Sequence, residues 1–283
     1  MTTRALVLAG GGLVGIAWEL GVLLGLRGAG VGTRGWERIV GTSAGSVVGA
    51  AAGTEGGLDA LRDASWVDSA SELNEYTATL DPVAIAEIEG LWFGRPEGPD
   101  LATRAAIGRR AIAAGTDQEA RFVRTVAAIL QIERWPAPLV TTAVDAETGA
   151  FRTFDAGSDV PLIAAVAASC AIPGVFPPVT VGGRRYIDGG VRSGTCADLA
   201  AGYDLVVLVA LTQPGGPWSA RQAAEVAALR AGGSRVVEIL PGPERLVPGD
   251  GQQLEPSQLP GVIETGIATG AAGATLVSDA EAA

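Results

Sequence analysis

Apolar residues occur along this chain in short continuous runs, and glycine-rich turns separate many of them. The N-terminal part contains an apolar run at 5–9, a glycine loop at 10–15, a longer apolar segment at 16–26, a run ending at Ile39-Val40, a glycine turn at 41–45 and an apolar segment at 46–52. Short continuous runs are typical of strands buried on both faces of a parallel sheet, and the longer segments predict buried helices. Strand, turn and helix therefore occur twice, which predicts βαβ units.

The remainder of the chain alternates between helical and strand-like patterns. Residues 58–134 have a helical pattern, which Asp81-Pro82 and the segment 94–99 interrupt. Further strands are predicted at 139–144, 150–154, 179–181, 184–187, 204–211 and 236–240. The turns Glu147-Thr148-Gly149 and Gly182-Gly183 join the first four of these strands into two hairpins. The pattern therefore predicts an α/β fold with a mixed sheet.

The composition limits the classes of function. The chain has 283 residues, of which 48% are hydrophobic, and we expect a single domain over 1–283 without a membrane span. Its net charge of −11 argues against binding to nucleic acid or anionic lipid, so membrane contact is expected to be peripheral at most. With no histidine and only Cys170 and Cys196, most zinc-site patterns are missing, and no metal or organic cofactor is expected. The first apolar run is too short for a signal peptide, so we expect reduced thiols and a cytoplasmic location.

The hexapeptide Gly41-Thr42-Ser43-Ala44-Gly45-Ser46 contains the pattern G-x-S-x-G. In acyl-transfer enzymes this pattern forms a strained strand-to-helix turn that presents a nucleophilic serine, and small neighbours give it room. The alternative is a tight turn with a serine at the helix start. The chain has no histidine to accept the proton of Ser43, so a catalytic serine would need another base.

The loop Gly10-Gly11-Gly12-Leu13-Val14-Gly15 has two possible functions. It satisfies G-x-G-x-x-G between a strand and a helix, which is the pattern of a dinucleotide-binding loop. That fold needs an acidic residue at the end of the second strand, whereas Glu37 precedes that strand, which runs into Ser43. Consecutive unhindered N–H groups also suit an oxyanion. We therefore favour the oxyanion interpretation over nucleotide binding.

Asp188 is the leading candidate for the missing base. It ends the second hairpin in the segment Tyr186-Ile187-Asp188-Gly189-Gly190, where two glycines open space behind it. Strand alternation places Arg184 on the same face, and we expect a nearby guanidinium to keep Asp188 ionised. A desolvated carboxylate in contact with a hydroxyl can accept its proton. The alternative is an ordinary turn aspartate after a hairpin.

Taken together, these sites resemble the patatin-like phospholipases, which are lipid acyl hydrolases with a Ser-Asp dyad. The resemblance rests on the loop 10–15, the turn 41–45, the segment Ala168 to Pro178 and the motif Asp188-Gly189-Gly190, in this order, and it extends from Leu6 to about Leu211. It implies a three-layer α/β/α sandwich around a mixed, mostly parallel sheet. Four elements in order are far more specific than any one of them.

The resemblance implies a role for each of these residues. Ser43 attacks an acyl ester, Asp188 takes its proton, and N–H groups of Gly10, Gly11, Gly12 and Ala44 hold the oxyanion. Supporting roles in the turn and the motifs fall to Gly15, Gly41, Gly45, Gly189 and Gly190. The expected partner is a lipid or small acyl-ester substrate. Without a histidine, we expect the pH profile of activity to lack a limb near the imidazole pKa of about 6.5. Activity should fall instead at lower pH, where a carboxylate protonates.

Three further expectations concern specificity and the outer segments. Many family members have a basic residue where this chain has Val14. The absence of that positive charge favours neutral lipids or small acyl esters over phospholipids as substrates. The segment 58–134 is predicted to form a helical cap or lid, with amphipathic packing on the core as the alternative. A flexible tail is predicted at about 272–283. Two other functions remain open: a catalytically silent member that binds a lipid or partner, and nucleotide binding by the loop 10–15.

Overall fold

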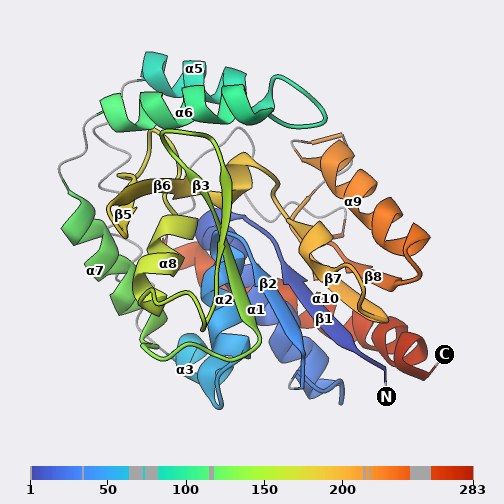
Figure 1. Ribbon diagram of the computed structural model, residues 1–283. Coiled ribbons are helices and arrows are strands. Elements are labelled where there is room, and N and C mark those ends of the chain that lie inside the picture. Colours follow the sequence, from blue (N-terminus) through green and yellow to red (C-terminus); the bar gives the residue numbers. More distant parts are fainter. Residues whose placement is uncertain are drawn as a thin grey trace.

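The computed structural model shows an α/β protein with one central sheet between two layers of helices (Figure 1). It describes residues 2–33, 35–63, 73, 82–114, 118–212, 215–216, 218–242 and 256–282. All structural statements below refer to these residues.

The sheet has eight strands in the order β5-β6-β3-β2-β1-β7-β8, and β4 pairs with β3 beside this path. The strands are β1 (Arg4–Leu8), β2 (Arg38–Gly41), β3 (Leu139–Asp145), β4 (Phe151–Phe154), β5 (Val179–Val181), β6 (Arg184–Asp188), β7 (Leu205–Val209) and β8 (Arg235–Ile239). The five strands from β3 to β8 along this order are parallel, whereas β4, β5 and β6 pair antiparallel. The predicted mixed, mostly parallel sheet with two hairpins is confirmed.

Helices cover both faces of this sheet. The α-helices are α1 (Gly12–Gly28), α2 (Ala44–Ala52), α3 (Gly57–Asp63), α5 (Pro82–Phe93), α6 (Leu101–Ala113), α7 (Glu119–Leu130), α8 (Leu162–Ser169), α9 (Ser219–Ala231) and α10 (Leu259–Ala282). The short 3₁₀ helices are η1 (Gly189–Val191), η2 (Ala197–Ala200) and η3 (Pro256–Gln258). The N-terminus, before β1, and the C-terminus, after α10, lie close together on one side of the molecule (Figure 1).

The alternation of side chains along each strand explains the three layers. On β1, Leu6 and Leu8 join one apolar cluster with α1, α2, α8 and α10, whereas Ala5 and Val7 join a second cluster with η2 and α9. Successive strand residues point to opposite faces, so a fully apolar strand needs a cover on both sides. A third cluster holds α5 and α6 against β3 and β6, through Ile88, Trp92 and Ile107.

The segment predicted as a cap divides between the two faces. Helices α3 and α7 belong to the first cluster, and α5 with α6 forms the third, so only these last two helices cover the end of β6. Figure 1 shows them side by side across one end of the molecule. The parts of the prediction at 64–72, 74–81 and 115–117 lie outside the described residues. We therefore restrict the name cap to α5 and α6.

The predicted flexible tail differs from the structure. Residues 272–282 continue the helix α10, and Ala274 and Val277 are buried. Close packing of glycines explains why: α10 lies so near to α1 that a methyl group on Gly266 would come within 3.0 Å of the Cα of Gly21. Near the C-terminal end, Glu281 pairs with Arg4 at the start of β1. No described helix is long and apolar enough to span a membrane.

The register of the sheet brings the two candidate catalytic residues to one level. Gly41 pairs with Thr141, so Ser43, two residues further on, lies level with Ala143 of β3. Asp188 pairs with Ala143 from the other side. Strands lie about 4.8 Å apart, so the backbones of β2 and β6 are roughly 10 Å apart across β3. Side chains that lean over the end of β3 can therefore meet.

Candidate active site

Ser43 occupies the sharp turn between β2 and α2. Its backbone has φ 53° and ψ −118°, a conformation that only glycine adopts without strain. Several hydrogen bonds hold the turn. Among them, the Ser43 N–H donates to Ser169 Oγ (2.9 Å), the Ser46 hydroxyl donates to the Ser43 carbonyl (2.6 Å), and the Gly45 N–H donates to the Ala9 carbonyl (3.0 Å). The serine side chain is buried, with 6% exposed. The strained turn predicted from the sequence is therefore present.

The glycines around this turn have no room for a side chain. A methyl group on Gly45 would lie 2.7 Å from Leu8 Cβ and closer still to the Leu8 carbonyl, and one on Gly41 would lie 2.5 Å from the Gly45 carbonyl oxygen. One on Gly15 would lie 2.9 Å from Ala44 Cβ. These contacts bring α1 and α2 onto the ends of β1 and β2, with backbone against backbone. The turn and the loop 10–15 therefore touch.

Asp188 stands at the end of β6, with 2% of its surface exposed. Its Oδ1 accepts a hydrogen bond from the Gly190 N–H (2.7 Å), and the Ser43 side chain lies near enough to lower the pKa of its carboxyl group. Gly189 behind it lies against Thr142, where a methyl group would meet the threonine hydroxyl. Ser43 and Asp188 are thus neighbours in the structure, and their catalytic roles stay a prediction.

Burial dominates the acidity of Asp188. Removal from water raises its pKa from 3.8 to about 7, and the hydrogen bonds from Ser43 and Gly190 offset part of this rise. The expected acid limit of activity, placed below the imidazole range, therefore moves up to about pH 7. A carboxylate with such a pKa is a much better base at neutral pH than an exposed aspartate, because its pKa lies near the working pH.

The cation expected beside Asp188 is elsewhere. Arg184 donates to Asp145 Oδ2 (3.0 Å), at the far end of the hairpin. Four residues of strand span about 13 Å, which is too far for Arg184 to reach the carboxyl of Asp188. Burial and hydrogen bonds, and not an ion pair with Arg184, therefore set the state of this carboxyl group.

Two of the glycines predicted for the oxyanion hole have free N–H groups. No acceptor among the described residues pairs with the N–H of Gly11, Gly12 or Ala44, whereas the Gly10 N–H donates to the Gly194 carbonyl (2.8 Å). Ala44 is the first residue of α2, where N–H groups have no partner within the helix. A methyl group on Gly10 would still lie 3.5 Å from Ser43 Cβ, so Gly10 faces the serine without offering its donor.

Several residues beside the dyad were not singled out by sequence. The Ser169 hydroxyl holds the Ser43 backbone, and Trp92 donates from Nε1 to the Gly190 carbonyl (3.0 Å). Trp218 packs on Gly194, since a methyl group there would lie 3.0 Å from its indole. Ser169 lies in the motif 168–178, which indicated its segment, and Trp92 lies in the apolar cluster of the predicted cap. Nothing in the sequence indicated Trp218.

Two further carboxyl or thiol groups lie near the dyad. Cys170 Sγ is 3.7 Å from Ser46 Oγ, and burial together with the charge of Asp188 raises the pKa of this thiol to about 12. Glu19 of α1 is buried behind the loop 10–15, and burial raises its pKa well above its ordinary value. Cys170 is therefore a neutral thiol, and burial favours the protonated form of Glu19.

The structure gives little support to binding of a nucleotide or a metal. The Glu37 carboxylate accepts from the Arg4 N–H (2.8 Å), at the end of β1 and β2 opposite to the loop 10–15. It cannot reach a ribose held at that loop. Among the residues that the structure describes, no three acidic or cysteine side chains are grouped so that they could hold a metal ion.

Comparison with known proteins bears on the whole of this region. A family model described as patatin-like phospholipase matches residues 6–201, which include the loop 10–15, Ser43 and Asp188. Two relatives described as uncharacterized NTE family proteins, from Mycobacterium bovis and Mycobacterium tuberculosis, are 32% identical over 209 residues. That alignment covers 73% of this chain and 48% of theirs, so the chain spans about half the length of the curated relatives it matches.

Two solved structures show a looser likeness. VipD from Legionella pneumophila covers 97% of this chain and 67% of its own, with 13% identity and a TM-score of 0.47. The type III effector protein ExoU covers 97% of this chain and 53% of its own, with 16% identity and a TM-score of 0.42.

Proposed function

This chain belongs to the patatin-like phospholipase family, and on that premise we propose that it is a serine acyl hydrolase in which Ser43 is the nucleophile and Asp188 the general base. The observation that carries the proposal is the proximity of the Ser43 side chain to a buried carboxyl group, since burial raises the pKa of Asp188 to about 7 while Ser43 lowers it. The family membership supports a lipid or acyl-ester substrate.

The first half of the reaction acylates the serine. The Ser43 oxygen attacks the carbonyl carbon of the ester while its proton passes to the Asp188 carboxylate. The carbonyl oxygen becomes negative, and the N–H groups of Gly11, Gly12 and Ala44 are placed to stabilise it, with the positive end of α2 behind them. When the tetrahedral intermediate collapses, the bond to the alcohol breaks and Asp188 returns the proton to the leaving oxygen.

The second half releases the acid. A water molecule gives a proton to Asp188 and attacks the acyl carbon, and the same donors hold the second oxyanion. Collapse of this intermediate breaks the bond to Ser43, which recovers its proton from Asp188. Because the carboxyl group must be ionised at the start of each half, activity should fall about tenfold per pH unit below about pH 7.

Hydrolysis of a p-nitrophenyl acyl ester series tests the proposal. We expect wild type to turn over at least one chain length, and Ser43→Ala and Asp188→Asn each to lower kcat by about 10⁴-fold. The matched control is Asp59→Asn, which makes the same change at an exposed carboxylate paired with Arg27 and should retain activity. Folded wild type that turns over no ester would leave a binding role as the better account.

A further inference from the structure

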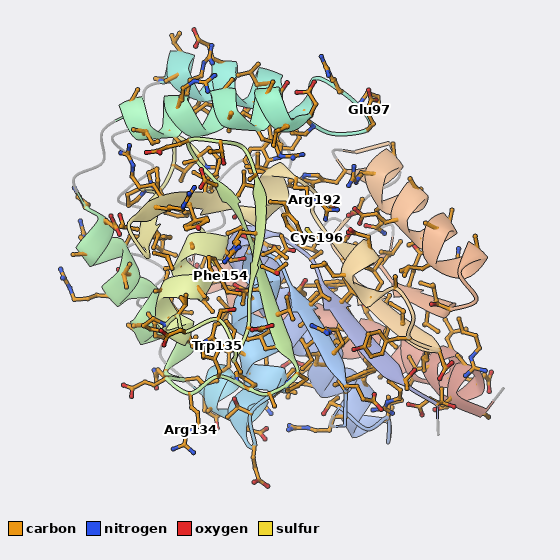
Figure 2. The ribbon with its side chains drawn as sticks, in the orientation of Figure 1. Glu97, Arg134, Trp135, Phe154, Arg192 and Cys196 are labelled. Atoms are coloured by element: carbon orange, nitrogen blue, oxygen red, sulfur yellow. The ribbon has the colours of Figure 1, made fainter. Side chains whose placement is uncertain are left out.

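A pocket of about 380 Å³ lies against the Asp188 side of the dyad. Its walls come from three separate parts of the chain: the end of α5 with the loop 95–99, the segment 190–192 that follows Asp188, and the start of α9. Figure 2 shows Arg192 between the cap and α9, with Glu97 on the loop above it. Apart from Gly190, the pocket is therefore built by residues outside the motifs that form the dyad.

The pocket touches the dyad on two sides. Gly190 forms part of the wall, and its N–H holds the Asp188 carboxyl. Trp218 forms another part and packs on Gly194, whose carbonyl holds Gly10 beside Ser43. The pocket therefore borders the backbone segment that holds Asp188 directly, and it reaches Ser43 only through Trp218, Gly194 and Gly10.

The charges that face the pocket all have one sign. Arg95, Arg192 and Arg221 line it, and no carboxylate is among its described lining residues. Their partners Asp100, Asp198 and Glu225 approach from outside the lining. This is unexpected in a chain with 20 basic and 31 acidic residues. A fourth cation, Arg104, stands close behind, since burial and then the charges of Arg192 and Arg221 lower its pKa.

The start of α9 adds backbone donors to these cations. Ser219, Ala220 and Arg221 form its first turn and line the pocket. Ser219 donates its N–H to the Gly216 carbonyl (3.2 Å), whereas the N–H groups of Ala220 and Arg221 have no acceptor among the described residues. The N-terminal end of a helix carries a partial positive charge and is suited to binding an anion.

Trp218 forms part of the pocket wall and carries a further N–H group. Its indole N–H is buried and has no acceptor among the described residues, although a buried donor without a partner is unfavourable. Its backbone is held at φ 66°, a strained value for a tryptophan. The ring packs edge-on against Trp92 and Phe93, with centroids 6.1 and 5.2 Å away. Trp218 thus keeps an unpartnered N–H and a strained backbone at the wall of a pocket lined by arginines.

We propose that this pocket binds an oxyanion, a phosphate or a carboxylate, carried by the leaving-group side of the acyl-ester substrate. The inference rests on the proposed function, because it gives the pocket a role in choosing that substrate. It also revises the expectation from Val14 and the net charge, which favoured neutral esters. The cations are contributed by the cap loop, the segment after Asp188 and α9 instead of the glycine loop.

A matched pair of esters tests this role. The octanoyl ester of 3-hydroxy-4-nitrobenzoate carries a carboxylate on its leaving group, and the corresponding methyl ester is the same molecule without that charge. We expect wild type to favour the charged ester in kcat/KM. In Arg95→Gln/Arg221→Gln this preference should fall about tenfold, the effect expected for lost charge-assisted hydrogen bonds. Gln at 221 can still donate to Glu225, which protects the fold.

Arg110→Gln is the control, because it removes the same charge from an exposed pair with Glu87 on the outer part of the cap. It should leave the preference and both rates unchanged. If wild type hydrolyses both esters and the double variant keeps the same preference, the inference is overturned while the proposed function stands.

Inorganic phosphate gives a second readout that does not need turnover. We expect phosphate to raise the melting temperature of wild type and not of the double variant. If neither ester is hydrolysed, the proposed function fails, and this shift alone decides: its presence supports the anion site and its absence overturns it. A shift without any ester preference would assign the pocket to a free anion and overturn its role in substrate choice.

Discussion

Around Ser43 the chain packs backbone against backbone, whereas around the neighbouring pocket it packs long side chains against one another. Gly45 lies on Leu8 with no space for a methyl group, while Trp92, Phe93 and Trp218 form the pocket wall by ring contacts. Backbone contacts fix the place of the nucleophile closely and leave little freedom for substitution. Side-chain walls can be exchanged with less effect on the fold. The reaction would thus be set by one region and the choice of substrate by the other.

Substitution of glycines should show this difference most strongly. Gly45→Ala puts a methyl group into the Leu8 backbone, so we expect a loss of more than about 4 kcal/mol of unfolding free energy, or no folded protein. Gly90→Ala on α5 meets nothing within 4 Å and should stabilise by about 0.5–1 kcal/mol. Urea unfolding measures both. Similar values for the two variants would contradict the account of the turn.

Asp188 should lower stability as the price of its function. In the folded protein its pKa is raised from 3.8 to about 7, so the buried group resists ionisation. Its stability contribution is complete below about pH 4 and is lost as the pH rises toward 7. Asp188→Asn should therefore gain roughly 4 kcal/mol relative to wild type at pH 8 and much less at pH 4. A difference in unfolding free energy that does not vary with pH would contradict this.

Glu225, on α9 beside the pocket, should help to position the backbone next to Ser43. Its buried carboxylate accepts from the Thr195 hydroxyl (2.6 Å) and the Ala197 N–H (3.0 Å), beside Gly194, whose carbonyl holds Gly10. Glu225→Leu removes both acceptors, and we expect a loss of about 2 kcal/mol in stability and about tenfold in kcat, with little change in KM. Glu225→Gln keeps one acceptor oxygen and should restore most of kcat. If Gln and Leu behave alike, Glu225 has no positioning role.

Trp218→Phe should produce the smallest effect and separate the regions again. It removes the unpartnered indole N–H, so the preference for the charged ester should fall about threefold, which corresponds to roughly 0.6 kcal/mol. Trp18→Phe is the control, because Trp18 carries another buried N–H without a described partner, in the core under α10. An equal change of preference in both variants would point to general loosening.

The sequence predicted the backbone-built region far better than the pocket. Glycine spacing indicated the turn at Ser43, the loop 10–15 and the motif at Asp188, because such turns tolerate few residues. The prediction that Arg184 lies beside Asp188 was wrong. Alternation along a strand gives the face on which a side chain lies, but two residues on the same face can still be too far apart to interact. The raised pKa of Asp188 depends on burial by distant segments, and so does the meeting of Arg95, Arg192 and Arg221. The periodicity of apolar residues along the chain does not predict such contacts between residues that are distant in the sequence.

The helices show the same limit. Continuous apolar runs predict buried strands and the first helix, but the prediction of a flexible tail at about 272–283 is wrong, because residues 272–282 continue α10. Gly266 and Gly270 lie against α1, so these residues are small because another helix is close and not because the segment is loose. A glycine-rich helix is stable only through such packing.

Labelling of Ser43 by a fluorophosphonate, followed by intact-protein mass spectrometry from about pH 5 to 9, tests the dyad most directly. The account predicts one label on wild type and none on Ser43→Ala. The labelling rate should rise about tenfold per unit up to about pH 7 and then level off, and Asp188→Asn should be at least about 100-fold slower with no such rise. Labelling of Asp188→Asn at the wild-type rate and pH dependence, or no label on Ser43, would contradict it.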